Sequence, residues 1–465
     1  KADESKRFAM SHVAGARASA GLVSVEFIPQ YELIVPGERL FATQSLNVLI
    51  RLSAAKDAGA TVRPDLDLAI VLDRSGSMAG DKLLHAKQAG IDLVNQLEPR
   101  DRVTLITYDD VVTTDVLARM ADSEGVLALR EALLDIEPGG YTALGPALFE
   151  ALDVLERQDG GGRLAHVLLL SDGLANQGEQ RPPVIAARVA AGYGTGTTVS
   201  TLGVGADYNE DLMTLVADEG GGRYHYIEDG PQIPSVLAAE LAGLTSSVAA
   251  DLSVEFAARE PTSVVAVHGY VSKTEERRTS VRVGYLSSGQ SREIVAQLEI
   301  PNHALRGVPG ETIELGMITV RYRPIDSAAG ADAPIVTLEL PATIILADDP
   351  ALARTSERTE VTVRVAEIES AAKLRAASEA VERNDFAAAE EIFAEAESEI
   401  GTKLENATDE AQRRKLQEEA DALAAAQHSL KKAKQSGEGR KHVVKQYKEK
   451  SYLRLKGSTD APLGD

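Results

Sequence analysis

The most constraining feature of the sequence is an apolar run that ends in a string of oxygen-bearing side chains. The run covers residues 66–72, is rich in Leu, Ile and Val without regular alternation, and is typical of a strand buried on both faces of a parallel sheet. Asp73, Ser75 and Ser77 follow directly. Open α/β folds bind ligands at the carboxyl edge of such a sheet. Oxygens at alternate positions of an extended loop can turn toward one point, and oxygen-only ligands suit a hard divalent cation.

Two later segments supply side chains at matching loop positions. Thr142 follows a Pro-Gly-Gly-Tyr segment and precedes a helix-like stretch, and Asp172 follows a second buried-strand run at residues 164–170. If these strands are parallel and adjacent, all three loops open at the same edge of the sheet. The simpler alternative for the first loop is helix capping by Ser77 or Asp81.

The five oxygen-bearing positions closely resemble the metal-ion-dependent adhesion site (MIDAS) of von Willebrand factor type A (vWA) domains. The segments IVLDRSGSM, GGYTALGPAL, LLLSDGLAN and GGRYHYIED also resemble the bacterial branch of that family. The resemblance implies a site for one Mg²⁺, or for Mn²⁺ or Ca²⁺, in which hydroxyls contact the metal directly or through water and carboxylates act mostly through water. The implied metal-binding residues are Asp73, Ser75, Ser77, Thr142 and Asp172. Ser171 and Gly173 are expected to support the third loop.

Strand and helix signals alternate through residues 66–247, which predicts a mostly parallel, doubly wound sheet, and the vWA resemblance implies the Rossmann-like topology. Strands are expected at 66–72, 102–108, 111–117, 164–170, 197–204 and 223–227, and helices near 81–97, 123–135, 143–157, 180–192, 208–217 and 231–247. The strands at 102–108 and 111–117 are expected to form a hairpin through the turn residues Asp109 and Asp110, which adds one antiparallel edge strand.

The flanking segments predict two further domains. Residues 248–350 carry strand signals at short spacing, which indicates a β-sandwich. The strands of residues 21–65 are expected to join that sandwich, so that the vWA domain is inserted; the alternative is a separate hairpin packed on the α/β domain. Residues 351–436 predict an antiparallel helical bundle, in which Gly401 ends the second helix.

The two ends of the chain have different compositions. Residues 1–20 are expected to be flexible, and the basic segment 437–465 is expected to be a partly disordered tail that is solvated or docks on an acidic partner. The N-terminus has no secretory apolar region, so we expect a cytoplasmic location. The alternative is an extracytoplasmic location with a removed leader, because the chain opens on Lys and not on Met.

Composition narrows the choice of partners and chemistry. The net charge of −22 disfavours nucleic acid and anionic membranes as partners. Cysteine is absent, which excludes disulfides and thiolate chemistry, and no apolar segment is long enough to span a bilayer.

The resemblance implies a protein-binding module and not an enzyme, so no residue is assigned a catalytic role. A partner's Asp or Glu would complete the coordination of the bound Mg²⁺, and a ring-forming ATPase is one partner class that the resemblance suggests. The first alternative is a scaffold or assembly protein with a structural or vestigial metal site. The second is a metal-dependent hydrolase, which is disfavoured because the chain has no phosphate-binding glycine loop and because His85, His166 and His225 are scattered.

Overall fold

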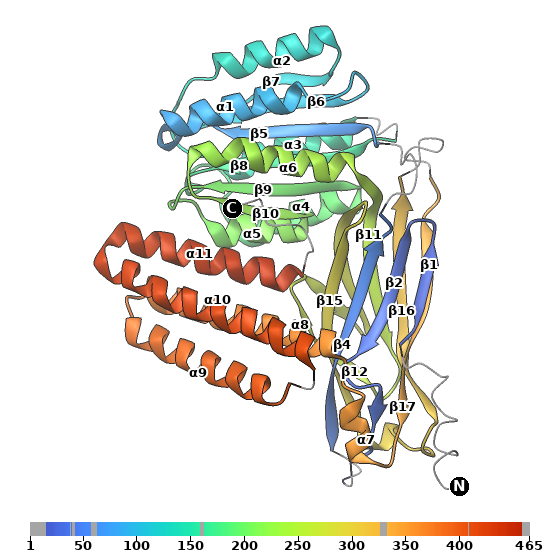
Figure 1. Ribbon diagram of the computed structural model, residues 1–465. Helices are drawn as coiled ribbons and strands as arrows, with labels where there is room; N and C mark the ends of the chain where they lie inside the picture. The colour runs from blue at the N-terminus through green and yellow to red at the C-terminus, as the bar shows by residue number, and fades with distance from the viewer. Residues whose placement is uncertain are drawn as a thin grey trace.

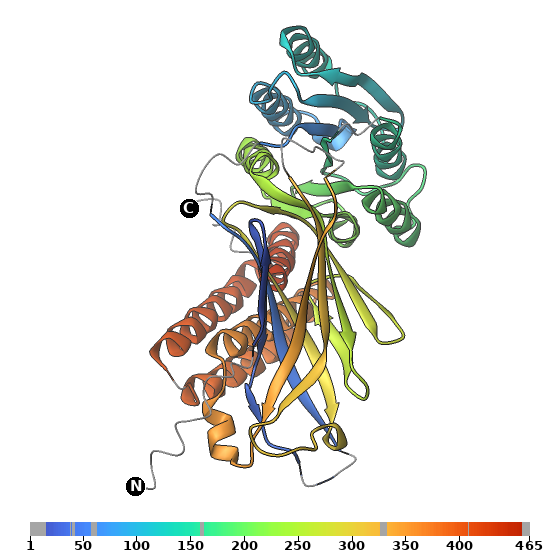
Figure 2. The same cartoon turned by 90° about the vertical axis from the view of Figure 1, so that its right-hand side faces the viewer.

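The computed structural model describes residues 15–37, 39, 42–56, 63–158, 162–325, 333–407 and 409–457. Figures 1 and 2 show three parts that pack together: an α/β domain, two elongated and mostly antiparallel sheets, and a set of long C-terminal helices. The helices lie beside the sheets, and the last of them also lies against the α/β domain (Figure 1).

The α/β domain contains a six-stranded sheet in the order β10-β9-β8-β5-β6-β7. Its strands are β5 (Leu66–Asp73), β6 (Arg102–Tyr108), β7 (Val112–Met120), β8 (Leu164–Ser171), β9 (Thr197–Val204) and β10 (Gly221–Ile227). Its helices are α1 (Asp81–Val94), α2 (Ser123–Asp135), α3 (Leu144–Arg157), α4 (Pro182–Gly194), α5 (Glu210–Glu219) and α6 (Ile233–Thr245). Neighbouring strands are parallel except for β7, which pairs antiparallel with β6. The predicted Rossmann-like α/β fold is confirmed.

The central strand β5 is buried along its whole length, which explains its unbroken apolar sequence. Leu68 and Ile70 belong to a core shared with α1, α2 and α6 on one face of the sheet. Ala69 and Val71 belong to a second core shared with α3, α4 and α5 on the other face. Both faces of the strand are therefore covered, and the chain leaves the sheet at Asp73.

The second part consists of two sheets in the orders β1-β2-β4-β15-β12 and β13-β14-β11-β16-β17-β3. The strands are β1 (Arg17–Ala20), β2 (Val23–Pro29), β3 (Leu33–Ile34), β4 (Thr43–Ala54), β11 (Ser247–Ala258), β12 (Ser263–His268), β13 (Ser272–Glu275), β14 (Arg278–Ser287), β15 (Ser291–Pro301), β16 (Thr312–Pro324) and β17 (Val336–Leu346). One core joins both sheets and includes Val48 of β4 and Phe256 of β11. Because β4 pairs with β15 along its length, the α/β domain is inserted between strands of this part.

The C-terminal part contains α7 (Pro350–Thr355), α8 (Thr359–Glu382), α9 (Phe386–Glu405), α10 (Glu410–Gln435) and α11 (Gly437–Lys456). The prediction that Gly401 ends a helix is wrong, because α9 continues to Glu405. Leu404 packs against two apolar cores, and this tertiary contact outweighs the low helix propensity of glycine.

Part of the predicted basic tail, residues 437–456, forms the ordered helix α11. Val443, Val444 and Tyr447 of this helix are buried in the core of the C-terminal helices. Its basic side chains reach acidic groups of the α/β domain: Lys441 pairs with Asp207 at 2.5 Å, Lys448 with Asp211 at 3.7 Å, and Lys456 with Asp218 at 2.7 Å. The acidic surface on which these lysines dock therefore lies within the same chain.

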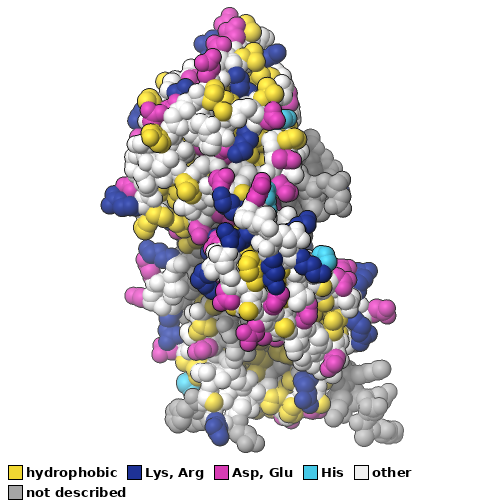
Figure 3. Space-filling model, turned by 90° about the vertical axis from the view of Figure 1, so that its left-hand side faces the viewer, with side chains coloured by type: hydrophobic (Ala, Val, Ile, Leu, Met, Phe, Trp, Pro, Cys, Tyr) yellow, Lys and Arg dark blue, Asp and Glu magenta, His cyan; other side chains and the backbone are white. Residues whose placement is uncertain are grey.

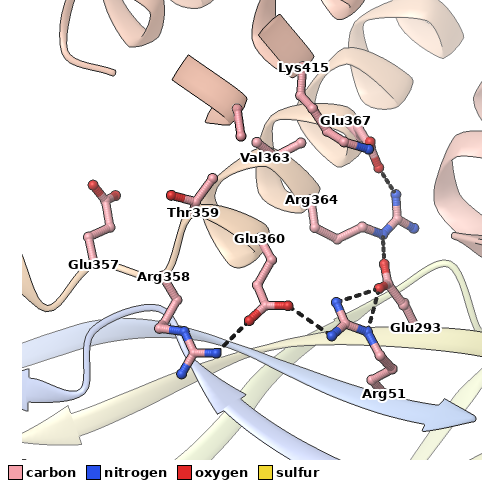
Figure 4. A pocket seen from close by; sticks show the side chains of 11 residues that line it. Arg51, Glu293, Glu357, Arg358, Thr359, Glu360, Val363, Arg364, Glu367 and Lys415 are labelled. Carbon is pink, nitrogen blue, oxygen red and sulfur yellow. Dashed lines mark hydrogen bonds and ion pairs between the residues drawn. The ribbon is translucent and has the colours of Figure 1, made fainter. Parts of the chain in front are cut away.

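A network of ion pairs fixes α8 on the outer face of the first sheet (Figure 4). Arg51 of β4 lies 2.9 Å from Glu293 of β15 and 2.8 Å from Glu360 of α8. Arg364, whose side chain is 3% exposed, lies 3.4 Å from Glu293 and donates a 2.9 Å hydrogen bond to the carbonyl oxygen of Leu455 in α11. These residues surround a cavity of about 470 Å³ in which charges of both signs are paired, so we assign the network a structural role.

Candidate functional site

Three loops meet at the carboxyl edge of the α/β sheet. The loop after β5 is tied to the loop before α3 by a 3.0 Å hydrogen bond from the Gly76 amide to the Gly140 carbonyl. The loop before α3 is tied to the loop after β8 by Asn176, whose side chain accepts a 2.8 Å hydrogen bond from the Thr142 amide. The Asn176 amide returns a 3.1 Å bond to the Thr142 carbonyl. Backbone and side-chain bonds therefore hold the three loops in a fixed arrangement.

The predicted residues of the first and third loops are joined in one hydrogen-bonded cluster. The Oγ atoms of Ser75 and Ser77 lie 3.1 Å apart, and Ser77 donates a 2.6 Å bond to Oδ1 of Asp172. Asp73 accepts a 2.8 Å bond from the Ser75 amide and a 2.7 Å bond from the Ser171 hydroxyl. The two carboxylates therefore orient the loops and the serine hydroxyls.

Thr142 completes the cluster beside Gly173. A Cβ atom placed on Gly173 would lie 3.1 Å from Oγ1 of Thr142, 3.5 Å from Oγ of Ser77 and 3.9 Å from Oγ of Ser75. Three hydroxyl oxygens from two loops thus surround one small space, which exists because residue 173 has no side chain. Oxygen-only donors in this arrangement fit a hard divalent cation.

The electrostatic setting of the cluster is unusual because both carboxylates are completely buried. Burial raises the pKa of Asp73 to about 6, against the opposing effect of its hydrogen bonds from Ser75 and Ser171. Asp172 is paired with Lys82, whose ammonium lies 2.6 Å from Oδ2. Sequence reasoning did not identify Lys82. The signal that could have identified Lys82 is its place in the first turn of α1, because this helix begins at the same edge of the sheet.

Other polar residues near the predicted site have structural partners. Asp109 accepts a 2.8 Å bond from the Val111 amide, which fits its predicted place in the β6–β7 turn, and also lies 3.1 Å from the Arg74 guanidinium. His166 contacts Thr198 at 2.7 Å, and His225 contacts Glu240 at 2.6 Å. Within the described ranges, no group of three or more His, Asp and Glu side chains is placed to hold a metal. The candidate metal site differs from such a group, because most of its five residues contribute a hydroxyl and not a carboxylate or imidazole.

Comparison with known proteins identifies this domain. Residues 67–239 match the family described as von Willebrand factor type A domain. An uncharacterised protein of Synechocystis is 28% identical over 63% of this chain and 69% of its own length. The uncharacterised protein YfbK of Escherichia coli is 30% identical over 43% of this chain and 35% of its own length. The structure of a von Willebrand factor type A protein from Catenulispora acidiphila covers 91% of both chains, with a TM-score of 0.68 and 18% identity.

The chain therefore contains a von Willebrand factor type A domain, with the α/β fold expected of it. The likeness to the C. acidiphila protein extends beyond this domain and, at 18% identity, concerns the fold. The aligned part makes up 35% of the E. coli relative, about a third of its length. In the described part of the chain, no helix is both long and apolar enough to cross a membrane.

Proposed function

We propose that this chain is a divalent-metal-dependent protein-binding module whose vWA domain binds an acidic side chain of a partner protein. The metal, Mg²⁺ or else Mn²⁺ or Ca²⁺, would be held by Asp73, Ser75, Ser77, Thr142 and Asp172. The observation that carries the proposal is the convergence of three hydroxyl oxygens on the space beside Gly173, with buried carboxylates behind them. In this proposal the two facing sheets act as a β-sandwich that, with the C-terminal helices, supports the vWA domain.

The residues of the site have separate tasks in this mechanism. Asp73 fixes the first loop through the Ser75 amide, and Ser171 fixes Asp73. Asp172 orients the hydroxyl of Ser77. A divalent cation held by these residues would supply the positive charge to which a carboxylate oxygen of the partner binds. Neutral hydroxyls leave most of the positive charge of the ion uncompensated, and this charge attracts the partner's Asp or Glu.

A hydrolytic function has weaker support. Both oxygens of Asp73 accept hydrogen bonds, from the Ser75 amide and the Ser171 hydroxyl. Both oxygens of Asp172 are also engaged, by Ser77 and Lys82. A nucleophilic or general-base carboxylate must reach the substrate, and both of these side chains are completely buried. The geometry of these two side chains favours orienting and holding over catalysis.

The second candidate function is a scaffold in which the site is structural. The ion pair between Lys82 and Asp172 favours it, because an ammonium inside the chain already balances one carboxylate of the cluster. In that case the three loops would be held together by protein groups, and binding of a partner would not depend on a metal.

Calorimetric titration of the chelator-treated full chain with Mg²⁺ and with Mn²⁺ tests the proposal. We expect saturable binding at one site in the wild type and its loss in Asp73→Ala. Asp421→Ala is the matched control, because Asp421 is an exposed residue of α10, outside the vWA domain. Equal binding by the wild type and Asp73→Ala, or absence of binding in both with circular dichroism unchanged, would favour the scaffold.

A further inference from the structure

Three large apolar side chains are exposed around the candidate metal site. Val111, Tyr141 and Leu174 are 57%, 62% and 58% exposed. Val111 lies in the β6–β7 turn, Tyr141 in the loop before α3, and Leu174 in the loop after β8. Single exposed apolar residues are common on protein surfaces. These three are significant because all of them lie in loops around the candidate metal site.

Contacts between the loops bring these side chains to the borders of the site. Tyr141 and Leu174 are the chain neighbours of Thr142 and Gly173, and the Thr142 hydroxyl lies 3.1 Å from where a Cβ on Gly173 would be. Neighbouring Cα atoms are about 3.8 Å apart, so both side chains start next to residues that border the hydroxyl-lined space. On another side, the Ala143 amide donates a 2.7 Å bond to the Asp109 carbonyl, which fixes the turn that carries Val111.

The surface continues from Leu174 toward α11. Leu174, Tyr208 and Val444 are among the residues that line a cavity of about 440 Å³ between the vWA domain and the C-terminal helices. Figure 3 shows that hydrophobic side chains on the α/β part of this face lie among charged groups of both signs. A partner chain that leaves the site on this side would therefore pass over Leu174 and then over a hollow lined mainly by charged side chains of both signs.

Asp110 disfavours a second acidic residue of the partner on its own side of the site. Asp110 lies beside the second loop, where its Oδ1 would be 2.2 Å from a Cβ placed on Gly140. A second carboxylate next to the one bound at the metal would face this aspartate, and the chain as a whole carries a net charge of −22. One acidic group with uncharged neighbours meets no such repulsion.

We infer that the partner segment presents a single Asp or Glu flanked by large apolar side chains, which pack on Tyr141, Leu174 and Val111. This inference rests on the proposed function, because the acidic group is placed by the metal. The metal position supplies charge recognition, and the three apolar side chains exclude water around it and select the neighbouring residues. Exposed aromatic and aliphatic groups around a polar centre are typical of the residues that dominate protein interfaces.

Peptide selection on the full chain tests this inference. A library with Asp fixed at its centre and random flanks is selected on the wild type in Mg²⁺, and the preferred peptide is synthesised for titration. We expect enrichment of Leu, Ile, Phe or Tyr next to the Asp. In the double variant Tyr141→Ser, Leu174→Ser we expect at least a tenfold loss of affinity for that peptide, with calorimetric Mg²⁺ binding unchanged. Val308→Ser is the control, because Val308 is 68% exposed between β15 and β16.

The possible failures of the two proposals differ. Enrichment of further acidic residues, absence of any flanking preference, or wild-type affinity in the double variant would overturn the inference and leave the proposed function standing. Equal peptide binding in chelator and in Mg²⁺, or unchanged binding by Asp73→Ala, would overturn the proposed function itself. A fixed-Asn library that is retained as well as the fixed-Asp library would count against both.

Discussion

The ammonium of Lys82 lies 2.6 Å from Oδ2 of Asp172, a carboxylate with no exposed surface. Ser77 donates a hydrogen bond to the other oxygen, so each oxygen of Asp172 has a partner within the chain. A positive charge built into the site affects any cation that binds there, and its removal gives the first prediction.

The variant Lys82→Met is expected to bind Mg²⁺ and Mn²⁺ more tightly than the wild type. Two positive groups a few ångströms apart repel each other, and in a water-like dielectric the relief amounts to about tenfold in affinity. Calorimetric titration of both proteins at the same ionic strength measures the change. Lys431→Met, at an exposed position of α10, controls for the altered net charge. Weaker binding by Lys82→Met would mean that the lysine supports the geometry of Asp172.

The variant Gly173→Ala is expected to lose Mg²⁺ binding while it stays folded. Its methyl group would enter the hydroxyl-lined space, 3.1 Å from Oγ1 of Thr142, so the space would be filled by carbon. We expect at least a tenfold loss of affinity by calorimetry and an unchanged circular dichroism spectrum. Gly194→Ala is the matched control, because a Cβ at that position in α4 meets no atom within 4 Å. Retained metal binding would place the ion elsewhere.

The variant Arg364→Ala is expected to loosen the C-terminal helices from the first sheet. The wild-type side chain is 3% exposed and lies 3.4 Å from Glu293 and 2.7 Å from Glu367. The substitution removes one of the two arginines beside Glu293, which stays paired with Arg51, and also the hydrogen bond to the Leu455 carbonyl, so we expect a loss of about 1–3 kcal/mol. Thermal unfolding followed by circular dichroism, together with limited proteolysis, measures the effect. Arg414→Ala, at a position 74% exposed, serves as the comparison, and equal unfolding temperatures would contradict the assigned role.

The interface between α11 and the vWA domain is expected to make stability depend on pH. Burial, together with the nearby Glu210 carboxylate, raises the pKa of Glu449 to about 7 from an ordinary value of 4.5. The folded chain therefore holds this proton more tightly than the unfolded chain does. Ionisation of Glu449 therefore destabilises the folded chain. This destabilisation grows as pH rises from 4.5 to 7 and is complete above 7.

The variant Glu449→Gln removes this titration and tests the expected dependence. It should be more stable than the wild type at pH 8, by about 1–3 kcal/mol, and closely similar near pH 4.5. Unfolding temperatures measured from pH 4.5 to 8.5 give the comparison, with Glu391→Gln on the exposed face of α9 as control. Parallel pH profiles for the wild type and Glu449→Gln would exclude Glu449 as the cause.

The α/β domain could be predicted from sequence because its strands are buried on both faces. Leu68 and Ile70 face one helical layer and Ala69 and Val71 the other, so an unbroken apolar run marks the strand directly. The oxygen-bearing residues that follow are recognisable because they come where such runs end.

Features that depend on contacts between distant segments could not be predicted. The strand β13 (Ser272–Glu275) consists of four exposed polar residues and has no apolar alternation to mark it. The sequence of α11 predicts a basic tail, because its few apolar residues are buried only by contact with other helices. Val443, Val444 and Tyr447 pack against α8, α9 and α10. The role of Lys82 depends on the distance between α1 and the end of β8, which follows from the folded sheet.

The insertion of the vWA domain between β4 and β11 has a consequence for synthesis on the ribosome. The partner of β4 (Thr43–Ala54) is β15 (Ser291–Pro301), so the first sheet stays incomplete until the whole inserted domain has emerged. At ordinary translation rates that interval is on the order of tens of seconds. During it, β1, β2 and β4 can pair among themselves, with the apolar residues Phe27 and Val48 still uncovered. Early folding of the insert brings the two halves of the sheet together and shortens the period in which the nascent chain can aggregate.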